Sequence, residues 1–237
     1  IANLAQRSDR IRQEIQRLQG LNEALKDAPD GQISLTDPDA RAMATSAKGS
    51  GFVGYNAQAV VDTETHLIVT HDVINAGHDR DQLAPMATAA KTALGRDEMS
   101  AIADKGYFSG REILACREAG VTTTVPRPET SGNRIKGMYV KADFAYDAAA
   151  DVYRCPAGNA LRYRFTTEEG GLKLHCYWTN DCQTCPIKAR CTTGKQRRVK
   201  RWEHEHLIDE MRDRMSRDPG VMALRRSTVE HPFGTIK

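Results

Sequence analysis

The chain has 237 residues, of which 40% are hydrophobic and 27% are charged, and its net charge is +3. These values are ordinary for a globular protein, and the length allows one large domain or a core with a sizeable insertion. No stretch approaches the roughly twenty apolar residues that span a bilayer, so no membrane-spanning segment is expected. The small net charge is not enough to indicate a nucleic-acid partner.

The first 31 residues are expected to form a helical arm that ends at the Pro-Asp-Gly sequence of residues 29–31. Apolar residues recur at every seventh position in this segment, at Leu4, Ile11, Leu18 and Leu25. A heptad of this length fits a coiled-coil arm or a helix that packs on the core of its own chain, and we favour the second interpretation.

The segment 48–126 has the pattern of a mixed α/β sheet flanked by helices. The expected elements are a hairpin of strands 55–62 and 66–73, a helix at 80–94, a strand at 100–103, a helix from Ser109 to 119 and a strand at 121–125. Helical periodicity returns at 206–215 and again from Gly220 onward. We therefore assign residues 48–126 and 206–237 to one core.

Residues 127–205 lack clear periodicity and are rich in Gly, Pro, Thr, Tyr and Cys, which predicts an inserted Cys-rich subdomain. Four of its cysteines have the spacing of a tetrahedral metal site, namely Cys155, Cys182, Cys185 and Cys191. Structural zinc is our first choice, an iron–sulfur cluster is the alternative, and free thiols are the third interpretation. Cys176, His204 and His206 are reserve ligands.

A run of basic residues begins inside this cysteine pattern and contains no acidic residue. Its members are Lys188, Arg190, Lys195, Arg197, Arg198, Lys200 and Arg201. Such a run can neutralise DNA phosphates, although a solvated loop without a partner explains it equally well when it is considered alone.

Acidic residues that suit a divalent cation occur at two places. Asp104 follows the short apolar strand, in Ala-Asp-Lys-Gly-Tyr, where ligands gather in open α/β sheets. Glu230 lies four residues after Arg226 and seven before Lys237, so a helix places the three on one face. Pro232 is expected to kink or end that helix. A turn aspartate and an exposed ion-pair helix are the structural alternatives.

Together with the Gly-Tyr-Asn-Ala-Gln segment at 54–58 and Val-Glu-His-Pro-Phe-Gly at 229–234, the chain from about Asp37 onward resembles the DDE transposases of bacterial insertion sequences. The resemblance implies an RNase H-like core in which Asp104 and Glu230 are catalytic. The Arg226, Glu230 and Lys237 spacing is similar to the Tyr-Arg-Glu-Lys motif of one branch, with Ala223 at the Tyr position.

The resemblance also implies partners and cofactors. We expect Mg²⁺ or Mn²⁺ at the carboxylates, double-stranded transposon ends and target DNA as substrates, a homodimer in the transposition complex, and a bacterial cytoplasmic, nucleoid-associated protein. The family's first catalytic Asp is expected upstream of residue 1, since Asp62 matches a non-catalytic hairpin position. The chain alone would then be inactive. A nuclease without strand transfer and a non-catalytic DNA-binding relic are the rival functions.

Overall fold

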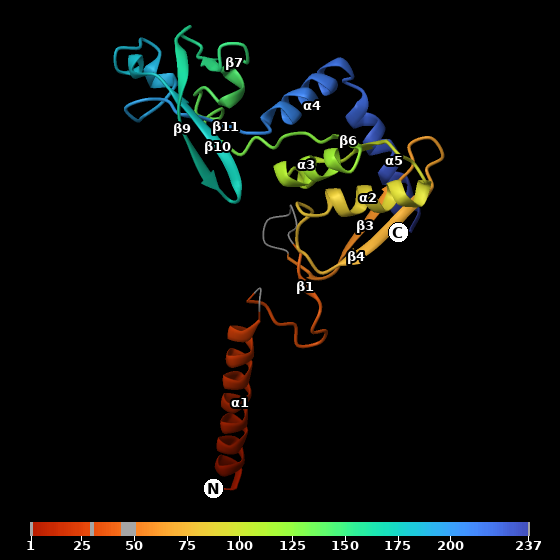
Figure 1. The fold of residues 1–237 in the computed structure, drawn as a ribbon. Helices are drawn as coiled ribbons and strands as arrows, with labels where there is room; N and C mark the ends of the chain where they lie inside the picture. Colours follow the sequence, from red (N-terminus) through yellow and green to blue (C-terminus); the bar gives the residue numbers. More distant parts are fainter. Residues whose placement is uncertain (1, 29–30, 44–50, 237) are drawn as a thin grey trace.

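The computed structural model describes the chain except for residues 1, 29–30, 44–50 and 237. The expected mixed α/β class is confirmed, with helices and short sheets combined in one molecule (Figure 1). No helix in the described part of the chain is long and apolar enough to cross a membrane.

The core contains two separate two-stranded sheets. The first is the antiparallel hairpin of β3 (Asn56–Val61) and β4 (Ile68–Ile74), and the second pairs β5 (Met99–Ile102) in parallel with β6 (Val121–Thr124). These boundaries lie within two residues of the predicted strands. A further short antiparallel pair joins β1 (Arg41–Ala42) to β2 (Val53–Gly54).

Helices cover the parallel pair and form one apolar core with it. The helices of this layer are α2 (Leu83–Leu94), α3 (Gly110–Glu118) and α4 (Glu205–Arg217). Parallel strands need a crossover connection, and α3 supplies it between β5 and β6. Met211 of α4 is 1% exposed, and its sulfur accepts the backbone N–H of Val125 at 3.2 Å. Buried residues from all three helices therefore close over the strands.

Residues 145–202 contain a five-stranded antiparallel sheet that the sequence pattern did not reveal. Its order is β11-β10-β9-β8-β7, and the strands are β7 (Ala145–Asp147), β8 (Val152–Arg154), β9 (Ala160–Glu169), β10 (Leu172–Trp178) and β11 (Val199–Trp202). The long β9 is exposed along most of both faces, so it lacks the alternation of a half-buried strand. The sheet has its own small core, to one side of the helices in Figure 1.

The C-terminal helix α5 (Val221–Ile236) runs beside β3 and β5. It continues through Pro232, so this residue does not end the helix. Proline removes a single backbone donor, and the helix tolerates that loss. Glu230 consequently lies within a continuous helix.

The N-terminal helix α1 (Ala2–Asp27) corrects our preferred interpretation of the heptad. Figure 1 shows it projecting away from the remainder of the molecule. Its apolar side chains are exposed, with Ile11 at 55% and Leu18 at 54%, and none of its described residues belongs to either core. The apolar stripe is present, but no surface in the described part of the chain covers it.

Candidate active site

Asp104 lies where β5 ends and the chain turns into the short 3₁₀ helix Lys105–Tyr107. It is the N-cap of that helix, and its Oδ1 accepts the backbone N–H of Gly106 at 2.7 Å. The side chain remains 41% exposed. A short apolar strand followed by a capped turn thus presents one carboxylate at the edge of the sheet.

A second carboxylate, which the sequence patterns did not single out, lies beside the first. The side-chain amides of Asn56 and Gln58 donate to Asp79 Oδ1 at 2.7 and 2.8 Å. A β-carbon at residue 106 would lie 2.9 Å from Asp104 Oδ1 and 3.4 Å from Asp79 Oδ2. Glycine at position 106 therefore leaves both carboxylates in place, whereas a β-carbon there would force Asp104 to shift.

A buried hydrogen bond fixes this turn to strand β3. Gln58 is 3% exposed, and its Oε1 accepts the hydroxyl of Tyr107, which follows Asp104 by three positions. Burial, with further contributions from Asp79 and Asp104, raises the pKa of Tyr107, so its hydroxyl stays protonated and donates. Strand β3 is therefore joined to the acidic residues by the hydrogen bonds of Asn56, Gln58 and Tyr107.

Helix α5 meets the same turn through Arg225. Its guanidinium lies 3.2 Å from Asp104 Oδ2 and is mostly shielded from solvent. Glu230 is exposed on this helix and, with Arg225 and Tyr107, lines an open hollow of about 450 Å³. The structure therefore brings the helix of Glu230 against the turn of Asp104, although 121 positions separate the paired residues Asp104 and Arg225.

A groove separates the two core sheets next to this site. It has a volume of about 260 Å³, and consecutive residues of both strands line it, 58–61 from β3 and 99–102 from β5. Successive side chains of a strand point to opposite faces of its sheet. A cavity that consecutive residues of both strands line therefore lies between the edges of the two strands. In the described residues β3 and β5 each have one partner strand. Apolar residues of α2 and Val229 of α5 also line the groove.

Comparison with protein families decides the assignment. The model of the transposase DDE domain matches residues 29–237. The chain belongs to the DDE transposase family. Comparison with curated proteins and with solved structures gives no match.

The other sequence-predicted site residues of this transposase domain take different positions. Arg226 is exposed on α5, and Lys237 lies outside the described residues. Asp62 directly follows the end of β3 that lies opposite Asn56. Six residues of extended strand separate Asp62 from Asn56 by about 20 Å. Its Oδ2 accepts the N–H and hydroxyl of Thr65, which lower its pKa. Asp62 is occupied with a hairpin turn.

The basic run needs one correction, because Arg201 is part of the interior. It is 8% exposed, forms an ion pair with Asp209 at 2.9 Å, and stacks on the ring of Tyr146 with its guanidinium carbon 3.7 Å from the ring centroid. In β11 the side chains of Val199 and Arg201 are buried and that of Lys200 is exposed, because successive side chains of a strand point to opposite faces. Arg201 of the transposase is not available to DNA phosphates.

The remaining members of the run differ in their surroundings. Lys200 pairs with Glu169 at the surface, and the guanidinium of Arg197 packs over the ring of Phe144. Arg198 stacks on Trp178, 5.1 Å from the ring centroid, and stays exposed. Lys188 is half-buried, whereas Arg190 and Lys195 are exposed. The free positive charge is therefore smaller than the sequence count.

The four cysteines of the predicted metal site line one small cavity of about 20 Å³. They are Cys155, Cys182, Cys185 and Cys191, and all four are free thiols. Burial raises the pKa of Cys191, and the three other thiols raise it further. Of the reserve ligands, Cys176 is buried in β10.

No three His, Cys, Asp or Glu side chains of the described residues are placed to hold a metal ion. The cysteines suit a soft metal by chemistry, and the carboxylates of Asp79, Asp104 and Glu230 suit a hard one, but neither group is complete as it stands. Zinc or an iron–sulfur cluster in the transposase stays a prediction, which elemental analysis of protein purified without oxygen would decide.

Proposed function

We propose that this DDE transposase cleaves phosphodiester bonds at transposon ends in a metal-dependent reaction and joins the released 3′ ends to target DNA. Asp104 and Glu230 are two of its catalytic carboxylates. The observation that carries the proposal is the contact of α5 with the acidic turn, where Arg225 lies 3.2 Å from Asp104 and shares a hollow with Tyr107 and Glu230. Carboxylates and a fixed cation at one open surface are what phosphoryl transfer requires.

The third carboxylate is supplied by an additional β-strand in the groove between β3 and β5. Among the residues that the structure describes, the edges of β3 and β5 that face this groove have no partner strand, and isolated two-stranded sheets gain stability when another strand joins them. Residues of both α2 and α5 line the groove, so an added strand would be covered by helices. A carboxylate at the end of such a strand would lie beside Asp104. Without it, the 237-residue chain is inactive.

Oxygen ligands for a divalent cation come from Asp104, Glu230 and the strand carboxylate. Mg²⁺ or Mn²⁺, when bound, activates water and offsets charge at the phosphate. The protein's own residues prepare this site: Gln58 holds the turn through Tyr107, Gly106 permits the close approach of Asp79, and Arg225 orients Asp104.

DNA is held by the exposed cations of the same molecule. Arg226 lies on α5, and Lys237, which lies outside the described residues, is the second cation of the sequence motif. In the insertion, the exposed members of the basic run contribute further phosphate contacts, from Arg190, Lys195 and Arg198. The substrates are double-stranded DNA, namely two transposon ends and one target. Because each transposon end needs an active site, the working form is proposed to be a homodimer on DNA in the bacterial cytoplasm.

Cleavage of labelled duplexes that carry the inverted repeats flanking the gene tests this proposal. We expect no cleavage by the 237-residue chain and Mg²⁺- or Mn²⁺-dependent cleavage by a chain extended upstream to include the missing strand. In the extended chain, Asp104→Asn or Glu230→Gln should remove most of the rate, because residues that act as a unit fail together. Glu203→Gln, at an exposed position outside the site, is the matched control.

Two results would overturn parts of the proposal. Cleavage that survives Asp104→Asn in the extended chain would remove the active-site assignment. Cleavage by the 237-residue chain that is lost in Asp79→Asn or Asp62→Ala would place the third carboxylate within this sequence.

A further inference from the structure

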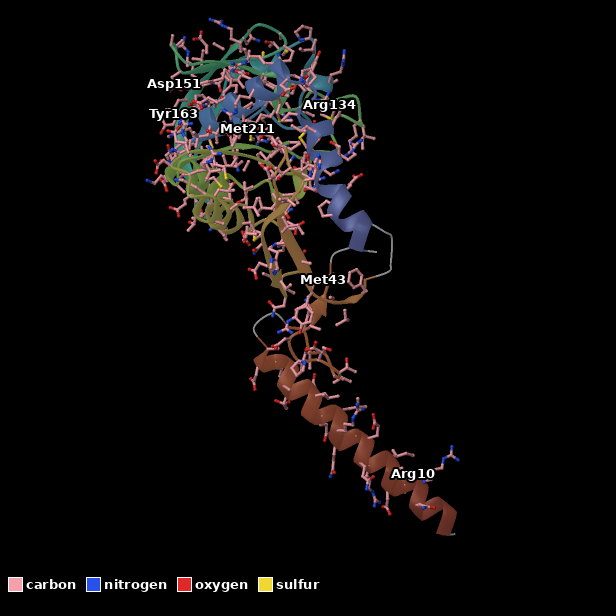
Figure 2. All side chains as sticks on the ribbon, turned by 90° about the vertical axis from the view of Figure 1, so that its right-hand side faces the viewer. Arg10, Met43, Arg134, Asp151, Tyr163 and Met211 are labelled. Carbon is pink, nitrogen blue, oxygen red and sulfur yellow. The ribbon has the colours of Figure 1, made fainter. Side chains whose placement is uncertain are left out.

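The exposed stripe of α1 has the arrangement of a coiled-coil seam. Ile11, Ile15, Leu18 and Leu25 lie along one side of the helix and are 55%, 49%, 54% and 40% exposed. Figure 2 shows the helix extending into solvent, with the side chain of Arg10 far from every other segment. A solvent-exposed helix that keeps four large aliphatic residues in register indicates a surface that another helix covers.

The heptad register of α1 is consistent along its length. Leu4, Ile11, Leu18 and Leu25 take the d positions, and the a positions fall on Ser8, Ile15 and Asn22. The outer positions are polar or small, as at Gln13, Gln16, Arg17 and Gly20. The period is seven residues, which favours a left-handed supercoil over a flat helix that lies on a sheet.

The charged residues of α1 are largely neutralised within the helix itself. Ion pairs three positions apart join Asp9 to Arg12 at 3.3 Å, Glu14 to Arg17 at 2.8 Å and Glu23 to Lys26 at 2.8 Å. A helix that packs on the apolar seam therefore does not have to supply charges that balance those of α1. A partner with the same seam would satisfy it.

We propose that α1 pairs in parallel with α1 of a second copy of this chain, as a two-stranded coiled coil. Ile15 at an a position, with Leu at three of the four d positions, favours a parallel dimer. A two-fold axis places Asn22 opposite Asn22 of the second copy, where the two amides hydrogen-bond to each other. An antiparallel pair would instead set this amide against the apolar layer of a d position. With 26 residues the paired helices are about 39 Å long.

The mass of the 237-residue chain in solution, measured without DNA by light scattering or sedimentation, tests the pairing independently of any DNA chemistry. We expect twice the 26.3 kDa of one chain. The seam variant Ile15→Glu with Leu18→Glu should halve that mass. The matched variant Gln13→Glu with Gln16→Glu adds the same residues to the outer face and should leave the dimer intact.

Orientation has a separate test. Asn22→Cys should form a disulfide-linked dimer on mild oxidation, because a parallel pair brings identical a positions together, whereas Gln13→Cys should not exceed the background of the native thiols. A monomeric mass for the unaltered chain, or a dimer that survives the seam variant with unchanged circular dichroism, would overturn the proposal. Equal cross-linking by both cysteine variants would overturn the parallel register.

Discussion

Two clusters of polar residues in this molecule differ in how far their carboxylates are buried and in how many cations contact them. At the junction of the insertion and the core, Glu205 is 4% exposed and accepts hydrogen bonds from Arg127 at 2.7 Å and Lys141 at 2.6 Å. At the acidic turn, Asp104 is partly exposed and lies beside Asp79, and in the described residues a single arginine contacts this pair.

The difference separates stability from function. A buried carboxylate must be neutralised, because an unpaired charge in the interior is costly. Two adjacent carboxylates with one arginine leave negative charge that only a further cation would balance, and an exposed position makes that cation accessible. We therefore expect substitutions at the junction to affect folding and substitutions at the acidic turn to affect activity.

The largest effect on stability is expected for Glu205→Gln. The substitution leaves Lys141 and Arg127 without a counter-charge, which costs about 3 kcal/mol of unfolding free energy where one partner of a buried pair is removed. Arg127 is half exposed and turns toward water, which keeps the loss at the low end. Urea denaturation measures it, with the exposed Glu203→Gln as control. A change below that of the control would show that the junction does not stabilise the fold.

Acid should weaken the same junction. Burial alone would raise the pKa of Glu205, but Lys141 and Arg127 outweigh burial and hold the pKa below its ordinary value of 4.5. A carboxylate with a lowered pKa contributes stability above its unfolded-state pKa and loses it as pH falls through the folded-state value. The unfolding free energy should therefore fall below about pH 4.5, and the fall should be smaller in Glu205→Gln. Parallel curves would contradict this origin.

An intermediate effect is expected for Gln58→Leu. The hydroxyl of Tyr107 and the carboxylate of Asp79 lose a buried partner, which costs about 2 kcal/mol by the usual penalty for unsatisfied polar groups. Because the turn is then free to move, cleavage by the extended chain should also decline. Tyr107→Phe removes one hydroxyl and should cost less. An unchanged denaturation midpoint in Gln58→Leu would show that the network does not hold the turn.

The smallest effect on stability is expected for Asp104→Asn. Its ion pair with Arg225 is partly exposed, and such pairs contribute about 1 kcal/mol or less. The substitution should leave the unfolding free energy almost unchanged and abolish cleavage. A loss of stability as large as that of Glu205→Gln would erase the distinction between the two clusters.

Local patterns predicted the parts of this molecule that depend on neighbouring residues. A short apolar stretch that ends on Asp104 predicted both β5 and the exposed acid, and the strand and helix boundaries of the core followed from periodicity. Asp79 and Arg225 were not predicted, because their importance arises from contacts with residues far away in the sequence. Periodicity also found the stripe of α1 without showing what would cover it.

The insertion was the least predictable region. Its sheet has one small core, and β9 is exposed on both faces, so composition was the main local signal. Local sequence also gave no sign that one residue of the basic run is buried, so the whole run was interpreted as surface. Strand β11 contains the last two residues of the run and directs Arg201 inward, where Asp209 and an aromatic ring contact it.

Gly106 has a consequence for how copies of this gene can diverge. Every other amino acid has a β-carbon, which at this position would lie 2.9 Å from a carboxylate oxygen of Asp104. The backbone there could still fold with a small side chain, so a missense change would displace the acid while the protein remained intact. Among related gene copies, the codon for residue 106 would thus be a marker that distinguishes elements still able to move from folded but immobile ones.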